Sequence, residues 1–121
     1  MTRYTYVLPL PPSVNHMYHE TPKGKALTKE ARAFRTEVES IISGRPRFRP
    51  RLDRCYSVMS WFTVPTWQHD IDNRVKALHD AVFGTRFDHR IVAAHQRKRV
   101  RPGEEPRCTV RIVELPPTWE G

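Results

Sequence analysis

Apolar residues recur at helical spacing over two stretches of the chain. Over residues 28–43 they return at steps of three and four, which places them on one face of a helix. This stripe consists of Leu27, Ala31, Phe34, Val38, Ile41 and Ile42. We expect Thr28 as its N-cap and Gly44 as its stop. A shorter stripe of Val75, Leu78 and Val82 predicts a second helix over residues 71–83, which Gly84 ends.

Four other stretches have the β-branched and aromatic content, or the alternation, that is typical of strands. They span residues 4–8, 55–64, 90–100 and 107–115. The stretch 55–64 is expected as a central strand, and in the last stretch Cys108, Val110 and Ile112 fall on one face. Because Pro102 and Gly103 form a turn between the last two strands, these are predicted to pair as a hairpin.

The remaining segments are predicted as loops. Residues 13–25 contain Ser, Asn, Pro and Gly, and residues 45–54 carry five arginines and two prolines without any period. The resulting order β-α-β-α-β-β predicts an α+β fold with a mixed sheet and two principal helices. No repeat or composition shift divides the chain, so we expect one domain over residues 1–121.

Charge and composition narrow the function. The chain has a net charge of +8 and a pI of about 10.1, which favours a polyanion such as nucleic acid over an inert cationic surface or an acidic protein partner. Cys55 and Cys108 lie far apart in apolar strands, which favours buried free thiols over a disulfide or zinc knuckle. With neither a signal-peptide pattern nor an apolar run of about 20 residues, we expect a cytoplasmic protein without membrane contact.

The segment HDIDNRVK, residues 69–76, carries the most chemistry. Asp70 and Asp72 stand two apart where an extended stretch enters the second helix, so their carboxylates are expected on one side. Such a pair repels unless a cation lies between, and Mg²⁺ prefers oxygen ligands. Lys76 shares a helix face with Asp72 and is placed to stabilise charge on a metal-bound phosphate. Asn73 adds a neutral hydrogen-bonding group.

A structural explanation of the same residues stays open. Asp72 alone would serve as an N-cap, with Asp70 complementing the helix dipole. Asp72 and Lys76 would then form an ordinary surface pair. Asp80, one turn beyond Lys76, is expected to form an ion pair with Lys76 or an arginine rather than to bind metal.

Asp88 is the next acid along the chain, and its surroundings are basic. Arg86, Arg90, Arg97, Lys98, Arg99 and Arg101 lie within fifteen residues of it. Carboxylates inside a basic surface suit a phosphodiester nuclease, because acids hold the metal while arginines hold the substrate. A DNA-binding protein without catalytic activity would not benefit from carboxylates at the centre of its basic surface, because they repel phosphate. No histidine pair, including His16 and His19, has a zinc-site spacing, and His69 and His89, which flank the acids, are expected to be solvated rather than to touch phosphate.

Two segments resemble the RusA-type Holliday junction resolvases, a family often carried by phages and prophages. DIDNRVKALHDAV, residues 70–82, resembles the family pattern D-x-D-N-x-x-K-x-x-x-D-A. LPPSVNHMY, residues 10–18, resembles its proline-proline-Ser-x-Asn-x-x-Tyr segment. The resemblance extends from about residue 4 to residue 115. It implies a homodimer that makes paired nicks in four-way DNA junctions with Mg²⁺, or Mn²⁺ as a substitute.

The resemblance also implies residue roles. Asp70 and Asp72 match the first two catalytic acids and Lys76 the essential lysine, while Asp80 matches a supporting acid. Asn15 and Tyr18 match residues that contact DNA or brace the site. For the third acid the family shows D-D-x-Q-V, and this chain has FDHRI over residues 87–91. Aligning Ile91 with the Val of this pattern places Asp88 at the position of the catalytic acid. A shift of the alignment by one residue places His89 there instead.

We therefore expect a magnesium-dependent endodeoxyribonuclease that resolves four-way junctions, with Asp70, Asp72 and Asp88 as metal ligands and Lys76 as a catalytic cation. The alternatives are a nuclease of other branched or duplex DNA, a non-catalytic junction-binding protein, and a chaperone acting through charge alone. The residues expected to contact DNA are Asn15, Tyr18, Asn73, Arg45, Arg47, Arg49, Arg51, Arg90, Arg97, Lys98 and Arg99.

Overall fold

A four-stranded mixed sheet forms the body of the computed structural model, which describes residues 2–118. Its strands, in spatial order, are β1 (Arg3–Pro9), β6 (Arg107–Leu115), β4 (Cys55–Val64) and β5 (Ile91–Val100). β6 pairs antiparallel with both β1 and β4, whereas β5 runs parallel to β4. The predicted α+β class and mixed sheet are confirmed, and β4 lies inside the sheet as expected.

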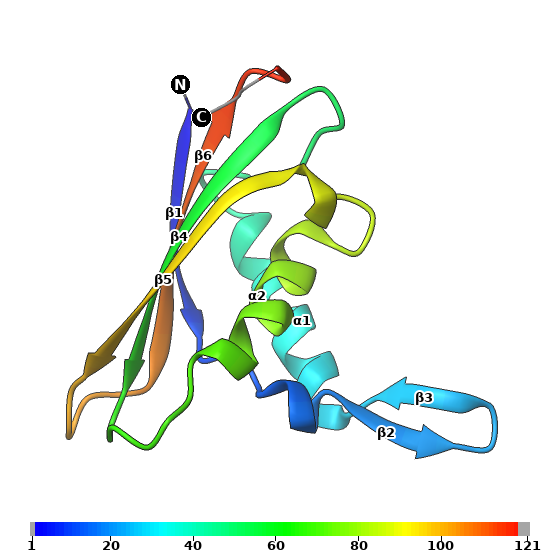
Figure 1. Ribbon diagram of the computed structural model, residues 1–121, viewed down its shortest axis with the longest axis vertical. Helices are drawn as coiled ribbons and strands as arrows, with labels where there is room; N and C mark the ends of the chain where they lie inside the picture. Colours follow the sequence, from blue (N-terminus) through cyan, green and yellow to red (C-terminus); the bar gives the residue numbers. More distant parts are fainter. Residues whose placement is uncertain (1, 119–121) are drawn as a thin grey trace.

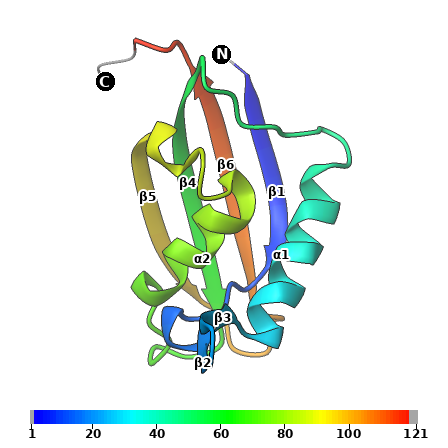
Figure 2. The same ribbon diagram turned by 90° about the vertical axis from the view of Figure 1, so that its right-hand side faces the viewer.

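Helices α1 (Lys29–Ile42) and α2 (Asp72–Phe83) cover one face of this sheet (Figures 1 and 2). Alternate strand residues point toward them and are buried, among them Tyr56, Val58 and Phe62 of β4. Phe34 and Val38 of α1 meet this layer, as do Leu78 and Val82 of α2. Figure 1 shows no helix of residues 2–118 on the opposite face of the sheet. The main hydrophobic core is therefore a single layer between sheet and helices, and a smaller cluster of Met17, Ala31 and Ala77 lies apart from the sheet.

The predicted boundaries of both helices hold to within a residue or two. The Ala31 amide donates to Thr28 Oγ1 at 3.2 Å, so Thr28 is the N-cap of α1. This helix ends at Ile42, and Ser43 rather than Gly44 occupies the C-cap. Gly84 caps α2 with a φ of 71°, a conformation that glycine adopts without a Cβ penalty.

The predicted loop over residues 13–25 is wrong. It contains a short 3-10 helix, η1 (Val14–His16), and a two-stranded hairpin of β2 (Tyr18–Thr21) and β3 (Gly24–Leu27). This hairpin projects from the body beside the helices (Figure 1). Because most of its residues are exposed, no alternation of apolar and polar residues marks it in the sequence.

The predicted pairing of the last two strands is also wrong. β5 and β6 lie on opposite sides of β4. β6 carries the buried residues Cys108, Val110, Ile112 and Leu115 and takes an interior position, whereas no residue of β5 is fully buried and this strand forms an edge. The apolar content of a strand, rather than the short turn at residues 102–103, therefore decides its neighbours.

Residues 45–54 lack helix or strand, as predicted, but the middle of this loop is anchored. Phe48 is buried and makes edge-to-face contacts with Tyr4, Tyr56 and Phe83. Both cysteines are free and buried, as predicted. Among the described residues, no helix is long and apolar enough to cross a membrane.

Candidate active site

The carboxylate of Asp70 organises the start of α2. Its Oδ1 accepts a hydrogen bond from the Asp72 amide at 3.0 Å, and its Oδ2 accepts one from Asn73 Nδ2 at 3.1 Å. Ile71 occupies the N-cap position and makes no side-chain cap bond. Asp72 is the first helical residue and is exposed. Capping by Asp72 is therefore excluded, and Asp70 supplies the acceptor instead.

Asp80 forms the predicted ion pair with Lys76. Asp80 Oδ2 lies 3.2 Å from Lys76 Nζ and 3.9 Å from Arg35 Nη2, and the Asp80 side chain is only 2% exposed. Within residues 2–118, this oxygen accepts no hydrogen bond of normal geometry. The two cations thus balance its charge without satisfying its lone pairs. Lys76 is directed along the helix toward Asp80, and its described ion pair is not with Asp72.

A pocket of about 410 Å³ lies between α2, β5 and the short 3-10 helix η2 (Asp88–Arg90). Its polar lining consists of Lys76, His79, Asp80 and Asp88, and its apolar lining of Val75, Ile91 and Ala94. Asp88 is half-buried there, whereas His89 is exposed and does not line the pocket. The structure thus brings together Lys76, Asp80 and Asp88, while Asp70 and Asp72 lie at the start of α2 and do not line this pocket.

Sequence reasoning missed His79 as part of this pocket. Burial lowers the pKa of His79, and the nearby charges of Asp80 and Asp88 oppose that shift. Its Nε2 is buried and has no hydrogen-bond partner in the described part of the chain. Burial therefore favours the neutral imidazole, the form that takes up a proton or binds a metal. One signal was present, because His79 follows Val75 by four residues and so shares the inner face of α2.

The donor chemistry suits Mg²⁺, although the donors are not gathered. Asp70, Asp72 and Asp88 offer carboxylate oxygens, which a hard cation prefers, and Asp80 adds a buried oxygen with no hydrogen bond inside the described ranges. However, no group of three His, Cys, Asp or Glu residues within residues 2–118 is arranged to hold a metal ion. The ligand set Asp70, Asp72 and Asp88 therefore stays a prediction.

The basic residues expected to bind DNA fall into two groups. Those with exposed side chains are Arg45, Arg47 and Arg49 in the loop before β4, and Arg97 and Arg99 on β5. Others are engaged within the protein. Arg90 Nε donates to the Arg54 carbonyl at 2.8 Å, and Lys98 Nζ donates to the Trp67 carbonyl at 2.8 Å.

Arg51 is exposed but pairs with Asp53 at 2.6 Å, and this contact raises the pKa of Arg51 and lowers that of Asp53. Asn73 is engaged through its bond to Asp70. Arg90, Lys98 and Asn73 therefore have structural partners that a role in DNA contact would have to displace or share.

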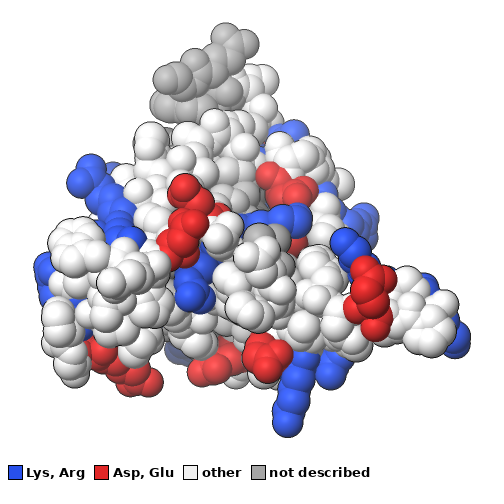
Figure 3. Space-filling model, turned by 60° about the horizontal axis from the view of Figure 1, so that its bottom comes forward, with Lys and Arg blue, Asp and Glu red and all other residues white. Residues whose placement is uncertain are grey.

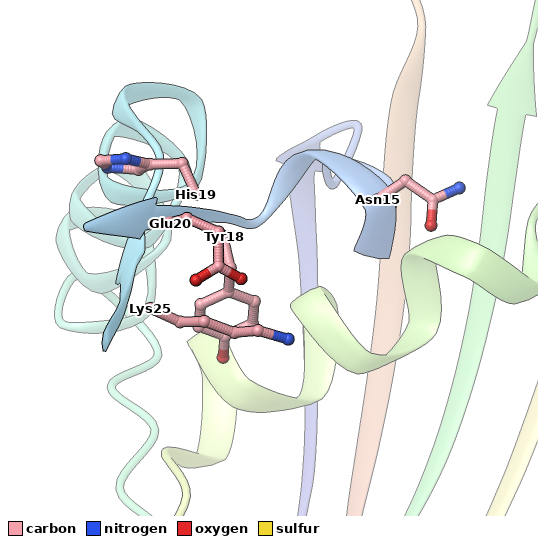
Figure 4. Close-up of a pocket in the computed structure, with 5 residues that line it drawn as sticks. All are labelled: Asn15, Tyr18, His19, Glu20 and Lys25. Carbon is pink, nitrogen blue, oxygen red and sulfur yellow. The ribbon is translucent and has the colours of Figure 1, made fainter. Parts of the chain in front are cut away.

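The N-terminal proline segment lies beside the same helix. Arg74 Nη1 donates to the Pro11 carbonyl at 2.6 Å, which ties this segment to the first turn of α2. Beyond it, Asn15 and Tyr18 are exposed and help to line a pocket of about 440 Å³ with His19, Glu20 and Lys25. In Figure 4, Lys25 extends across the Tyr18 ring, while His19 points to the other side of the hairpin. The segment is thus positioned by α2, and its polar side chains remain open to a ligand.

Acidic and basic groups alternate over the lower end of the molecule (Figure 3). Blue and red side chains are interspersed there among uncharged ones, and the blue ones do not form one uniform basic patch.

No protein-family model matches this chain, and no curated protein matches it significantly. The resemblance of residues 10–18 and 70–82 to the RusA-type resolvases therefore depends on those motifs alone.

Proposed function

We propose that this protein is a magnesium-dependent endodeoxyribonuclease that resolves four-way DNA junctions. One observation carries the proposal: Lys76 and Asp88 line the same pocket, and Lys76 belongs to the helix that begins at Asp70 and Asp72. Lys76 and Asp88 stand 12 positions apart in two separate segments, and the lysine of the D-x-D-N-x-x-K segment and the acid of the FDHRI segment both line this pocket. A basic chain with a net charge of +8 supplies the attraction for DNA.

Each residue has a chemical role in this proposal. Asp70, Asp72 and Asp88 would hold Mg²⁺, for which Mn²⁺ would substitute. The bound ion supplies an activated water and a polarised phosphate. Lys76 stabilises the charge that develops on the phosphate, and Asp80 positions the Lys76 ammonium group through their 3.2 Å contact.

The substrate has two-fold symmetry, and so would the enzyme. Two copies of the chain related by a two-fold axis would present two pockets to one junction, and each would nick one strand. Arg45, Arg47 and Arg49 project from the loop before β4 and are proposed to hold the junction arms.

A second candidate is a junction-binding protein that does not cut. It is favoured by the finding that residues 2–118 contain no three metal-binding side chains in a cluster. A nuclease acting on other branched DNA or on duplex shares the proposed site and differs only in substrate.

The test uses a labelled four-way junction and a duplex of matched sequence, each with Mg²⁺ or with chelator. Wild type is compared with Asp72→Asn and with Glu37→Gln, an exposed residue of α1 that serves as the matched control. Wild type and Glu37→Gln should nick the junction symmetrically with Mg²⁺ only. Asp72→Asn should bind the junction but cut it at least about 100-fold more slowly.

Tight junction binding by wild type without any metal-dependent cut would refute the nuclease and leave the binding protein. Equal cutting of junction and duplex would still support the proposed metal site but would contradict the proposed selectivity for junctions.

A further inference from the structure

The sheet face that points away from α1 and α2 is exposed and strongly basic. Strand register places Arg3, Thr5 and Val7 of β1 on this face beside Arg111 and Thr109 of β6. Met59 and Trp61 of β4 follow, and then His95, Arg97 and Arg99 of β5. Figure 1 shows this side of the sheet free of the described helices. We call these residues the outer sheet face.

Its charges have one sign. Arg3, His95, Arg97, Arg99 and Arg111 are exposed. Arg107 also lies here, but it pairs with Glu104 of the preceding turn at 3.0 Å. No Asp or Glu occurs among the outward-facing residues of β1, β4, β5 and β6, which the structure describes in full. Four free guanidinium groups therefore stand on one surface without a carboxylate between them.

Trp61 holds two of these arginines. The guanidinium carbon of Arg99 lies 5.4 Å from the centre of the Trp61 ring, and that of Arg111 lies 5.3 Å from it. The two arginines come from the strands on either side of β4, so the ring is flanked from both neighbours. Cation–π contacts of this kind restrict the arginine side chains while leaving their N–H donors free for phosphate oxygens.

We propose that the outer sheet face is a second DNA-contact surface, which binds the phosphate backbone through Arg97, Arg99 and Arg111, with Trp61 as their positioning residue. The inference rests on the proposed function only in taking DNA as the polyanion. A second copy of the chain fits less well, because a two-fold contact through this face would bring like cations of both copies together.

The test measures binding alone, in chelator and in the Asp72→Asn background, by fluorescence anisotropy of a labelled four-way junction at several salt concentrations. Arg99→Gln with Arg111→Gln removes two contacts, so the affinity should fall at least about 10-fold and the salt slope by about 2. The matched control, Lys29→Gln with Arg32→Gln, removes two exposed charges of α1 and should change the affinity less than about twofold.

Trp61→Leu keeps every charge but removes the ring, and should weaken binding about threefold with an unchanged salt slope. Trp61→Phe should restore most of that loss, because it restores an aromatic face. Arg97→Gln has no such contact with Trp61 and tests the surface independently of the ring, with an expected slope change of about 1. Far-UV circular dichroism and Tm establish that each variant folds.

Arginine variants that bind like the control would overturn the proposal. A second outcome would also overturn it. If the arginine substitutions convert a dimer to a monomer in sedimentation experiments while the DNA affinity of each protomer is unchanged, the face is a contact between copies of the chain. This experiment measures binding and not cutting, so its result does not depend on nuclease activity. A protein that binds DNA through this face but does not cut it would contradict the proposed nuclease function and still support the outer sheet face as a DNA-contact surface.

Discussion

At the scale of single residues, the buried carboxylate of Asp80 joins groups that the sequence separates. Arg35 and Asp80 are 45 positions apart, and their contact depends on how α1 packs against α2. Asp70, Asp72, Lys76 and Asp80 were predicted because they stand close together in one motif. Asp88 was predicted from its basic surroundings and from the FDHRI segment. Arg35 was not predicted, because only the packed structure shows its contact with Asp80. His79 was not predicted either, although its position four residues after Val75 places it on the inner face of α2.

His79 makes stability depend on pH. Burial lowers its pKa in the folded chain, so the unfolded chain binds a proton near pH 6.5 that the folded chain does not. The free energy of unfolding should therefore fall as the pH drops from 7 toward 5. In His79→Gln this fall should be smaller, as measured by urea unfolding at both pH values. His19→Gln, at an exposed position, is the control and should keep the wild-type dependence. An unchanged dependence in His79→Gln would show that His79 does not titrate differently on folding.

At the scale of elements, residues that are neighbours in the sequence predict the helices better than they predict which strands pair. A cap, a periodic stripe and a glycine stop are all neighbours in sequence, so α1 and α2 were predicted nearly to the residue. The β2–β3 hairpin buries too little for a pattern to show. The placement of β5 and β6 required comparing how apolar two strands are, and their proximity in sequence was misleading.

The cap of α1 allows a direct test. Thr28 Oγ1 accepts from the Ala31 amide and also donates to the His16 carbonyl, which links α1 to η1. Thr28→Ala should lower the free energy of unfolding by about 1 kcal/mol, and Thr28→Ser should keep most of it. Thr36→Ala, at an exposed position inside α1, should be neutral or slightly stabilising because alanine favours helix. Chemical denaturation of the three variants measures these differences. Equal losses at positions 28 and 36 would contradict a specific cap.

At the scale of the whole molecule, one aromatic residue fastens the arginine-rich loop to the core. Phe48 is 3% exposed and contacts rings from β1, β4 and α2. No period in residues 45–54 indicates this burial. It arises because Tyr4, Tyr56 and Phe83, which are distant in sequence, leave a space that Phe48 fills.

Phe48→Ala should destabilise the fold by about 3–5 kcal/mol, since it opens a cavity among those rings. Arg47→Ala changes an exposed neighbour and should shift stability by less than about 0.5 kcal/mol. Urea unfolding followed by tryptophan fluorescence gives both values. A small loss for Phe48→Ala would mean that the loop is held at other points.

The position of β6 has a consequence for the order in which the molecule can assemble. The strand comes last among the described elements, yet it lies between β1 and β4 and joins them. While the ribosome is still synthesising residues before 107, neither strand has that partner, and the apolar side chains of both remain without their shared neighbour. The core can close only after β6 leaves the exit tunnel, so nascent chains of this protein should depend on chaperones until that strand has emerged.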